Sequence, residues 1–179
     1  MRALPPGVSL RAASAVDAPA TAAIYAHHVR HGTASFELDP PDTGEMERRW
    51  RDVTDRGLPY LVAVSAGEVI GYAYAGPYRP RPAYRFTVED SVYVRADACG
   101  RGIGRVLLGE LIEAATHAGA RQMIAVIGDA ENAASIGVHA ALGFRRVGVL
   151  DKVGNKFSRW LDVVLMQRAL GPGAGAPAS

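Results

Sequence analysis

Residues 87–111 read TVEDSVYVRADACGRGIGRVLLGEL, and this stretch decides the fold. It begins as a strand, because Val92 and Val94 are β-branched and Tyr93 between them is aromatic. A short polar turn then leads to the glycine-rich segment GRGIGR at residues 100–105 and to an apolar helix. The first N–H groups of a helix have no internal partner and carry partial positive charge. This order of elements therefore predicts a turn that binds phosphate.

Two common phosphate-binding motifs do not fit this stretch. A nucleotide P-loop requires the pattern G-x-x-x-x-G-K-[ST], which the sequence does not contain. A Rossmann fingerprint requires a third glycine, and Leu107 stands at that position. From this stretch alone, an ordinary tight turn before a surface helix stays open beside a phosphate-binding turn of another type.

A second segment favours the phosphate-binding interpretation. Residues 132–144 read NAASIGVHAALGF and resemble the N-x-x-[AS]-x-x-x-[YH]-x-x-x-G-[FY] helix of the GNAT N-acetyltransferase superfamily. Residues 101–104, RGIG, resemble the pyrophosphate loop of the same superfamily, and the spacing between the two segments also fits. Three further segments look like the phosphinothricin (methionine sulfoximine) acetyltransferase group, namely residues 87–94, 126–128 and 156–163.

The resemblance extends from about residue 10 to residue 170 and includes one departure. Cys99 stands where the family usually carries Gln or Arg. Because backbone N–H groups hold most of the phosphate, we expect cofactor binding to survive this change. A cysteine nucleophile is not favoured, since the family transfers the acetyl group directly from the thioester and nothing marks Cys99 as activated.

Composition sets limits on the function. Of the 179 residues, 49% are hydrophobic and 21% are charged, and the formal net charge is +2, which is too small to indicate nucleic-acid binding. A single cysteine excludes an internal disulfide framework. No stretch approaches the roughly 20 apolar residues of a membrane helix, and the N-terminus lacks the apolar run of a signal peptide. We therefore expect a soluble, cytoplasmic protein with no membrane partner.

Three histidines lie close together near residue 30. His27 and His31 are spaced i, i+4, as metal ligands on one helix face can be. No third ligand of suitable spacing is nearby, and alanine-rich helices often carry surface histidines. No metal site is therefore expected.

The order of the predicted elements indicates one domain of the α/β (α+β) class at residues 8–170. A mixed, mostly antiparallel sheet with helices on both faces is expected, as in the GNAT fold. Residues 171–179, GPGAGAPAS, are predicted to be a flexible C-terminal tail. Strands are predicted at residues 8–12, 60–64, 69–74, 87–94, 123–127, 144–149 and 160–166, helices at 17–32, 45–56, 103–118 and 132–142, and a loop at 152–159.

The resemblance implies acetyl-CoA as co-substrate and assigns residues to it. Backbone groups of the central strand would pair with the pantetheine arm, and the glycine-rich turn would bind the pyrophosphate. Asn132 at the start of its helix would reach the pantetheine. The predicted cofactor residues are Val92, Tyr93, Val94, Gly100, Arg101, Gly102, Ile103, Gly104, Arg105, Asn132 and Ser135.

Glu89 and His139 are the predicted catalytic residues. Glu89 matches the carboxylate of the family and can collect a proton from an amine. His139 stands where many relatives have a tyrosine general acid, and either proton donation to the thiolate or fixing of the substrate is open. A surface-strand glutamate and a structural helix histidine are the alternatives. Asp90 is a candidate substrate contact or supporting residue.

The acceptor is expected to be an amino acid analogue, because the resemblance is to a group that acts on such analogues. A carboxylate must then be held, and the planar guanidinium of arginine suits it. The predicted substrate residues are Phe36, Arg79, Arg81, Glu89, Asp90 and Ser91, and Phe36 could instead be a plain core aromatic. A homodimer is expected, with residues 156–160 near the acceptor pocket. A peptide N-terminus or another amine as acceptor, and an acyl-CoA-binding sensor without catalysis, remain the alternative functions.

Overall fold

The computed structural model describes residues 4–176 of the chain. Its strands are β1 (Val8–Ala12), β2 (Tyr60–Ser65), β3 (Glu68–Pro77), β4 (Thr87–Val94), β5 (Gln122–Gly128), β6 (Arg145–Lys156) and β7 (Arg159–Ala169). Its α-helices are α1 (Ala18–His31), α2 (Thr43–Thr54), α3 (Ile103–His117) and α4 (Ala133–Ala141). This order is the predicted one. Helix α2 begins earlier than predicted because the Asp42 side chain accepts a hydrogen bond from the Glu45 N–H (2.7 Å) and caps it.

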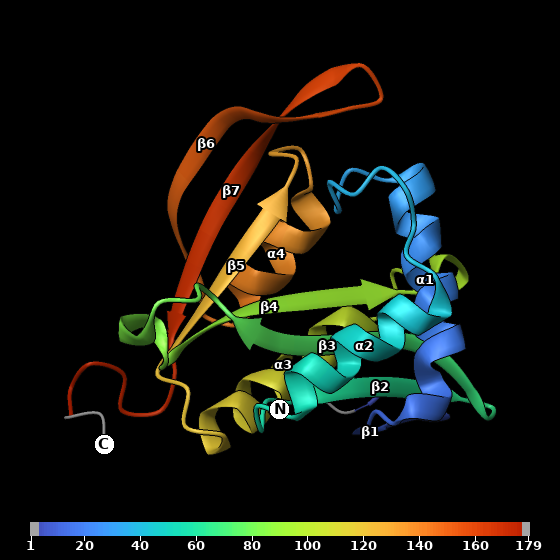
Figure 1. The fold of residues 1–179 in the computed structure, drawn as a ribbon, viewed down its shortest axis with the longest axis horizontal. Coiled ribbons are helices and arrows are strands. Elements are labelled where there is room, and N and C mark those ends of the chain that lie inside the picture. The colour runs from blue at the N-terminus through green and yellow to red at the C-terminus, as the bar shows by residue number, and fades with distance from the viewer. Residues whose placement is uncertain (1–3, 177–179) are drawn as a thin grey trace.

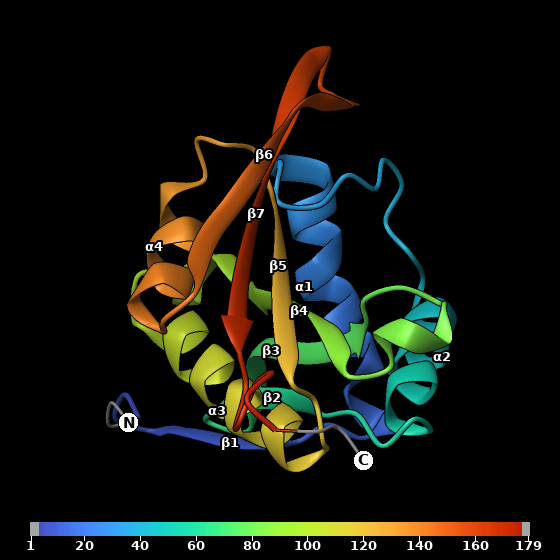
Figure 2. The ribbon, with the colours of Figure 1, turned by 90° about the vertical axis from the view of Figure 1, so that its left-hand side faces the viewer.

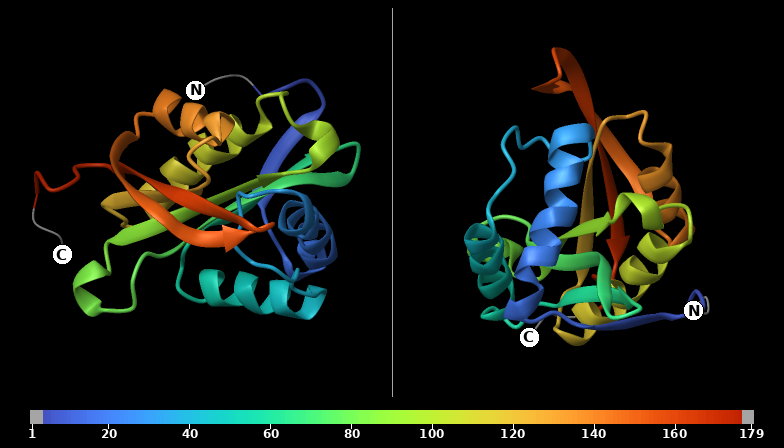
Figure 3. Two further views of the ribbon diagram at one scale, coloured as in Figure 1. Left: turned by 90° about the horizontal axis from the view of Figure 1, so that it is seen from above. Right: turned by 90° about the vertical axis from the view of Figure 1, so that its right-hand side faces the viewer.

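Within the described residues the strands form one sheet in the order β1-β2-β3-β4-β5-β7-β6 (Figure 1). Every neighbouring pair is antiparallel except β4 and β5, which run parallel. Helices α1 and α2 cover one face of the sheet, and α3 and α4 cover the other (Figure 3). The expected mixed, mostly antiparallel sheet with helices on both faces is confirmed.

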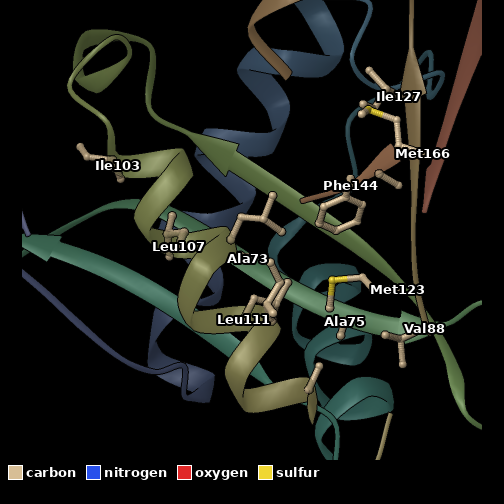
Figure 4. Packing of buried hydrophobic residues seen from close by; sticks show 14 of the residues in the cluster. Ala73, Ala75, Val88, Ile103, Leu107, Leu111, Met123, Ile127, Phe144 and Met166 are labelled. Carbon is tan, nitrogen blue, oxygen red and sulfur yellow. The ribbon is translucent and has the colours of Figure 1, made fainter. Parts of the chain in front are cut away.

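Each face of the sheet has its own buried cluster. Leu107 and Leu111 of α3 are fully buried against Ala73 and other strand residues (Figure 4). On the opposite face, Val29 of α1 packs in a cluster that contains the fully buried Tyr72. Since burying one such side chain is worth about 1.5–3 kcal/mol, these clusters hold both helix layers against the sheet.

Strands β4 and β5 separate part of the way along their length. Their register ends with Glu89 opposite Ile124, although β4 continues to Val94 and β5 to Gly128. The two arrows begin side by side in Figure 1 and then point apart. We call the opening between residues 90–94 and 125–128 the split. Within residues 4–176, no strand pairs with the backbone groups on this side of β4 beyond Glu89.

The β6–β7 hairpin corrects one prediction. Residues 152–159, predicted as a loop, belong mostly to two long strands that project beyond the rest of the molecule (Figures 1 and 2). Only Phe157 and Ser158 connect them, and their φ angles are 51° and 58°. Positive φ at both turn positions usually calls for Asn and Gly. Phe and Ser at these positions gave no sign of the turn in the sequence.

The chain after β7 folds back in short turns. The Gly173 N–H donates to the Leu170 carbonyl (2.8 Å), and the Gly175 N–H donates to the Pro172 carbonyl (2.9 Å). Residues 177–179 lie outside the described part of the chain, and a flexible tail at residues 171–179 stays a prediction. None of the helices in residues 4–176 combines the length and the apolar composition that a membrane-spanning helix needs.

Candidate active site

A pocket of about 460 Å³ lies at the split. Residues of β4 form one wall, and residues of β5, β7 and α4 form the other. The loop after α1 closes one side. The lining residues are Tyr25, Ala34, Ser35, Phe36, Glu37, Tyr74, Glu89, Asp90, Ser91, Val92, Tyr93, Ala125, Val126, Ile127, Gly128, Asn132, Ser135, His139 and Val163. This list brings together nine predicted site residues, namely Phe36, Glu89, Asp90, Ser91, Val92, Tyr93, Asn132, Ser135 and His139.

The backbone of β4 is open on the pocket side. The Arg95 N–H donates to the Ile70 carbonyl of β3 (2.9 Å). Because alternate residues of an antiparallel strand turn to opposite sides, the odd-numbered residues of β4 face β3 and the even-numbered ones face the split. The Val92 N–H and C=O and the Val94 N–H are therefore directed into the opening. The Val94 carbonyl is already engaged, since His28 Nε2 of α1 donates to it (2.8 Å).

The glycine-rich turn has the conformation that close approach to phosphate needs. Gly100 and Gly102 have φ angles of 75° and 82°, and Gly102 is the N-cap of α3. A Cβ atom on Gly104 would lie 3.6 Å from Val94. The first N–H groups of α3 therefore sit next to the open edge of β4. The turn and the edge together fit the pyrophosphate and the pantetheine arm of an acyl-CoA.

The side chains of this turn differ in their exposure to solvent. Arg101 is exposed and Arg105 is partly exposed, so both are accessible to phosphate. Ile103 is only 2% exposed and packs in the core, so its N–H alone is left for a ligand. Cys99 is an exposed residue, but its thiol is partly buried. This partial burial, and to a smaller extent the charge of Asp97, raise the pKa of the thiol, so Cys99 is not activated as a nucleophile.

Glu89 lies half-buried at the point where β4 and β5 separate. Burial and then the charge of Asp90 raise the pKa of Glu89, and the charge of Arg79 acts in the opposite direction. The described residues offer its carboxylate no hydrogen bond within the protein. A raised pKa and open lone pairs are what a group that accepts a proton from a ligand needs.

Asp90 and His139 form a buried pair across the split. His139 Nε2 lies 2.9 Å from Asp90 Oδ2, and His139 Nδ1 lies 2.8 Å from the Ser135 carbonyl. His139 is 5% exposed and Asp90 is 8% exposed. Both ring nitrogens of His139 are therefore engaged by protein atoms, and its role as a general acid stays a prediction.

The start of α4 borders the same opening. Asn132 caps this helix, and its Oδ1 accepts a hydrogen bond from the Ser135 N–H (3.1 Å). Ser135 Oγ lies 3.4 Å from His139 Nδ1. The amide nitrogen of Asn132 is left for a ligand, which agrees with the cofactor role predicted for this residue.

Residues 33–37, which we call the acceptor-side loop, are fixed by contacts to distant segments. Thr33 Oγ1 donates to Asp129 Oδ2 (2.8 Å), and the buried Lys156 Nζ donates to the Ser35 carbonyl (2.6 Å). Burial lowers the pKa of Lys156. The Tyr25 hydroxyl lies 2.7 Å from Ser35 Oγ and donates to Glu37 Oε1 (3.0 Å).

Phe36 lies over two glycines of the sheet. A Cβ atom on Gly154 would come within 2.1 Å of the Phe36 ring, and one on Gly128 within 2.9 Å. Phe36 is 37% exposed and lines the pocket, so it is not a plain core aromatic. Its position depends on the absence of side chains at both glycines.

The two predicted acceptor arginines lie outside the pocket lining. Arg79 and Arg81 are exposed on the loop after β3. The Arg79 guanidinium stacks over the Tyr78 ring at 4.8 Å, and its charge acts on Glu89. A role in binding the acceptor stays a prediction for both.

Sequence reasoning missed several pocket residues. Tyr25 and Tyr74 line the pocket, yet they lie on α1 and β3, far from the motifs. Only the aromatic residue types gave a signal, and that signal could not tell a pocket from the core. Among residues 4–176 no group of three or more His, Cys, Asp or Glu side chains is arranged to hold a metal.

Comparison with known proteins agrees with this geometry. The model of the "Acetyltransferase (GNAT) family" matches residues 22–144. The chain is 60% identical over 157 residues to the phosphinothricin N-acetyltransferase of Alcaligenes faecalis, which covers 88% of this chain and 80% of that protein. It is 46% identical over 171 residues to the L-methionine sulfoximine/L-methionine sulfone acetyltransferase of Pseudomonas aeruginosa. That match covers 94% of this chain and 98% of the relative.

A solved structure has the same fold. The crystal structure of a phosphinothricin acetyltransferase from Sinorhizobium meliloti, in complex with acetyl-CoA, superimposes with a TM-score of 0.94 at 46% identity, over 97% of this chain and 94% of that one. The family match covers more than half of the chain, and these relatives cover most of it. The chain therefore belongs to the GNAT acetyltransferase family and is an acetyl-CoA-dependent N-acetyltransferase.

Proposed function

We propose that this acetyltransferase acts on the α-amino group of a small amino acid analogue of the phosphinothricin, methionine sulfoximine or methionine sulfone type. The names of the two relatives described above support this acceptor class. The observation that carries the proposal is that Glu89 stands in the pocket directly beside the open backbone edge of β4. A pocket of about 460 Å³ suits a small acceptor together with the reactive end of the cofactor.

The backbone of β4 and α3 holds the donor in this proposal. Acetyl-CoA supplies an acetyl thioester. The open groups of Val92 and Val94 pair with the pantetheine arm, and the first N–H groups of α3 bind the pyrophosphate. The Val92 N–H donates to the thioester oxygen as that oxygen gains negative charge.

Glu89 provides the base. An α-amino group with a pKa of ~8 is mostly protonated at neutral pH, so it must lose a proton before it can attack. Glu89 accepts that proton, directly or through one water. The new C–N bond then forms, the C–S bond breaks, and the thiolate leaves.

The acceptor carboxylate is proposed to bind Arg79 or Arg81. Both guanidinium groups are exposed on one loop, and Arg79 is near enough to influence Glu89. A planar guanidinium can hold both oxygens of a carboxylate. Since neither residue lines the pocket, the loop at residues 78–86 must bring one of them over the acceptor.

A homodimer and a cytoplasmic location belong to the same proposal. The β6–β7 hairpin carries apolar side chains that are unusually exposed, such as Leu150 (46%), Val153 (55%) and Trp160 (66%). Strand β6 is also an edge of the sheet. An exposed apolar edge strand is a surface that a second copy can cover. Trp160→Glu is expected to raise the dimer dissociation constant in sedimentation velocity, whereas Val16→Glu, at another exposed apolar site, is the matched control.

A thiol-release assay with acetyl-CoA tests the acceptor class. The panel contains phosphinothricin, methionine sulfoximine, methionine sulfone, the matching amines without a carboxylate, and short peptides. The amino acid analogues are expected to give the highest kcat/KM, and loss of the carboxylate should lower it. Faster turnover of peptides would overturn the proposed acceptor. Saturable binding of CoA without thiol release for any amine would indicate a sensor.

A further inference from the structure

His139 is held between two hydrogen-bond acceptors. The Ser135 carbonyl faces Nδ1 at 2.8 Å, and Asp90 Oδ2 faces Nε2 at 2.9 Å. A carbonyl oxygen has only lone pairs, so Nδ1 must carry the proton of that bond. A neutral imidazole has one N–H, which leaves no proton on Nε2 for the carboxylate. Both contacts are satisfied together when the ring is a doubly protonated imidazolium.

The surroundings favour that charged ring. Burial lowers the pKa of His139, but the hydrogen bond and the charge of Asp90, together with the bond to the Ser135 carbonyl, raise it by more, so that the net shift is upward. Asp90 is the one charged side chain among the described residues that contributes to this shift. Just before β6, the Phe144 ring meets the imidazole edge-on at 5.0 Å and brings no charge.

We propose that Asp90 and His139 form a permanent buried ion pair that positions Glu89 and the start of α4, and that His139 is not the proton donor to the leaving thiolate. The proposal rests on the acetyl-transfer function given above. His139 is then a positioning residue, because neither of its ring nitrogens is free to reach a substrate.

The position of the pair explains what it would hold in place. Backbone pairing between β4 and β5 stops at Glu89, and Asp90 is the next residue along β4. His139 lies on α4, whose N-cap is Asn132 and whose first turn carries Ser135. The ion pair therefore joins the two walls of the split at the point where strand pairing ends.

The pair also sets the charge beside the base. The negative charge of Asp90 raises the pKa of Glu89, and Arg79 opposes it. Loss of the Asp90 charge should move the acidic limb of the kcat/KM profile to lower pH. Loss of the His139 charge should move that limb to higher pH, since Asp90 is then uncompensated.

Nitrogen-15 NMR of the histidine rings tests the pair in the wild-type enzyme without any substrate. Both ring nitrogens of His139 are expected to stay protonated at neutral pH. His28 is the internal comparison, because burial lowers its pKa and its Nε2 meets only the Val94 carbonyl, so it should lose its second proton first. In Asp90→Asn, His139 should deprotonate at a lower pH than in the wild type. A His139 ring with a single protonated nitrogen at neutral pH would overturn the proposal.

Kinetics of Asp90→Asn, His139→Gln and the double variant separate positioning from proton donation. Removing one partner leaves a buried group without its counter-charge, so the double variant should lose less kcat than the product of the two single losses. Losses that multiply, with the alkaline limb of kcat abolished in His139→Gln, would show a general acid and contradict the proposal. If no amine is acetylated, the proposed function fails, whereas the NMR result still decides whether the ion pair exists.

The pH dependence of unfolding gives a third measurement. A histidine whose pKa is raised in the folded state adds stability that is complete below its unfolded value, and that is lost as the pH rises through its folded value. As the pH rises from the unfolded to the folded pKa of His139, the denaturant midpoint of the wild type should therefore fall more than that of Asp90→Asn. Parallel curves for the two proteins would contradict the ion pair.

Discussion

The two ends of the pocket are built in different ways. At the end proposed to bind the cofactor, residues 92–105 form one continuous segment that presents backbone N–H groups and glycines. At the other end of the pocket, three segments that are distant in the sequence meet: α1 with the acceptor-side loop that follows it, Asp129 just after β5, and the β6–β7 hairpin. Local sequence therefore determines the conformation of the cofactor end, whereas tertiary packing determines the conformation of the acceptor end. Changes at the two ends should therefore affect different kinetic constants.

The largest effect is expected where the two ends meet. Glu89→Gln keeps the shape of the side chain but removes the base, so kcat should fall by about 10²–10⁴-fold. The KM for acetyl-CoA should change little, because the side chain contributes nothing to the backbone surface that holds the cofactor. Steady-state kinetics measure both constants. A folded variant with near wild-type kcat would end the assignment of Glu89 as the base.

The next largest effect is expected at the cofactor end. In Gly104→Val, added carbon atoms stand between the first turn of α3 and Val92 and Val94, and they should keep the pyrophosphate away from the N–H groups. Loss of one or two hydrogen bonds to a charged group corresponds to a rise of about tenfold to a hundredfold in the KM for acetyl-CoA. The KM for the acceptor should stay within a factor of about two.

A glycine of another helix provides the control for this change. A Cβ atom on Gly137 in α4 would meet no atom within 4 Å, so Gly137→Val brings the same helix cost without blocking the turn. Equal changes of both KM values in Gly104→Val, or an unchanged KM for acetyl-CoA in a folded protein, would contradict the assignment of the turn.

At the acceptor end, a smaller effect is expected, and it should fall on the KM for the acceptor instead of the KM for acetyl-CoA. Gly154→Ala places a methyl group where the Phe36 ring now lies, and the partly exposed ring can move away. The free energy of unfolding should fall by only about 1 kcal/mol, at the low end for overpacking. The KM for the acceptor should rise severalfold without a change in the KM for acetyl-CoA. Gly148→Ala on the same strand, with no atom within 4 Å, is the matched control and should be silent.

The smallest effect is expected from Lys156→Met. This change removes the hydrogen bond to the Ser35 carbonyl and loosens the acceptor-side loop, so the KM for the acceptor should rise less than about tenfold. Because burial lowers the pKa of Lys156, its ammonium is lost at a lower pH than that of a lysine in water. The wild-type acceptor KM should therefore rise as the pH passes through that value. A similar rise in the variant would assign the pH dependence to another group.

The difference between a site built from one segment and a site built from distant segments also decides how much could be predicted from the sequence. The β4 strand, the glycine-rich turn and the α4 motif each lie within one segment, so their pattern predicted the fold, which the structure confirms, and the cofactor surface, which stays a prediction. The contact of Lys156 with Ser35 spans 121 positions, and no local pattern records it. Likewise, the Asp90–His139 contact spans 49 positions, so only the folded structure shows that both ring nitrogens are engaged. The Phe157–Ser158 turn was missed because its residue types are unusual for positive φ.

The most direct test of the central claim is the pH dependence of the Glu89→Gln deficit. The ratio of wild-type to variant kcat is measured with one amino acid analogue from below to above the ~8 pKa of its amino group. If Glu89 collects the amine proton, the ratio should shrink as the pH rises, because more of the acceptor then arrives deprotonated. A ratio that stays the same at every pH would show that Glu89 only positions the acceptor, and would contradict its role as the base.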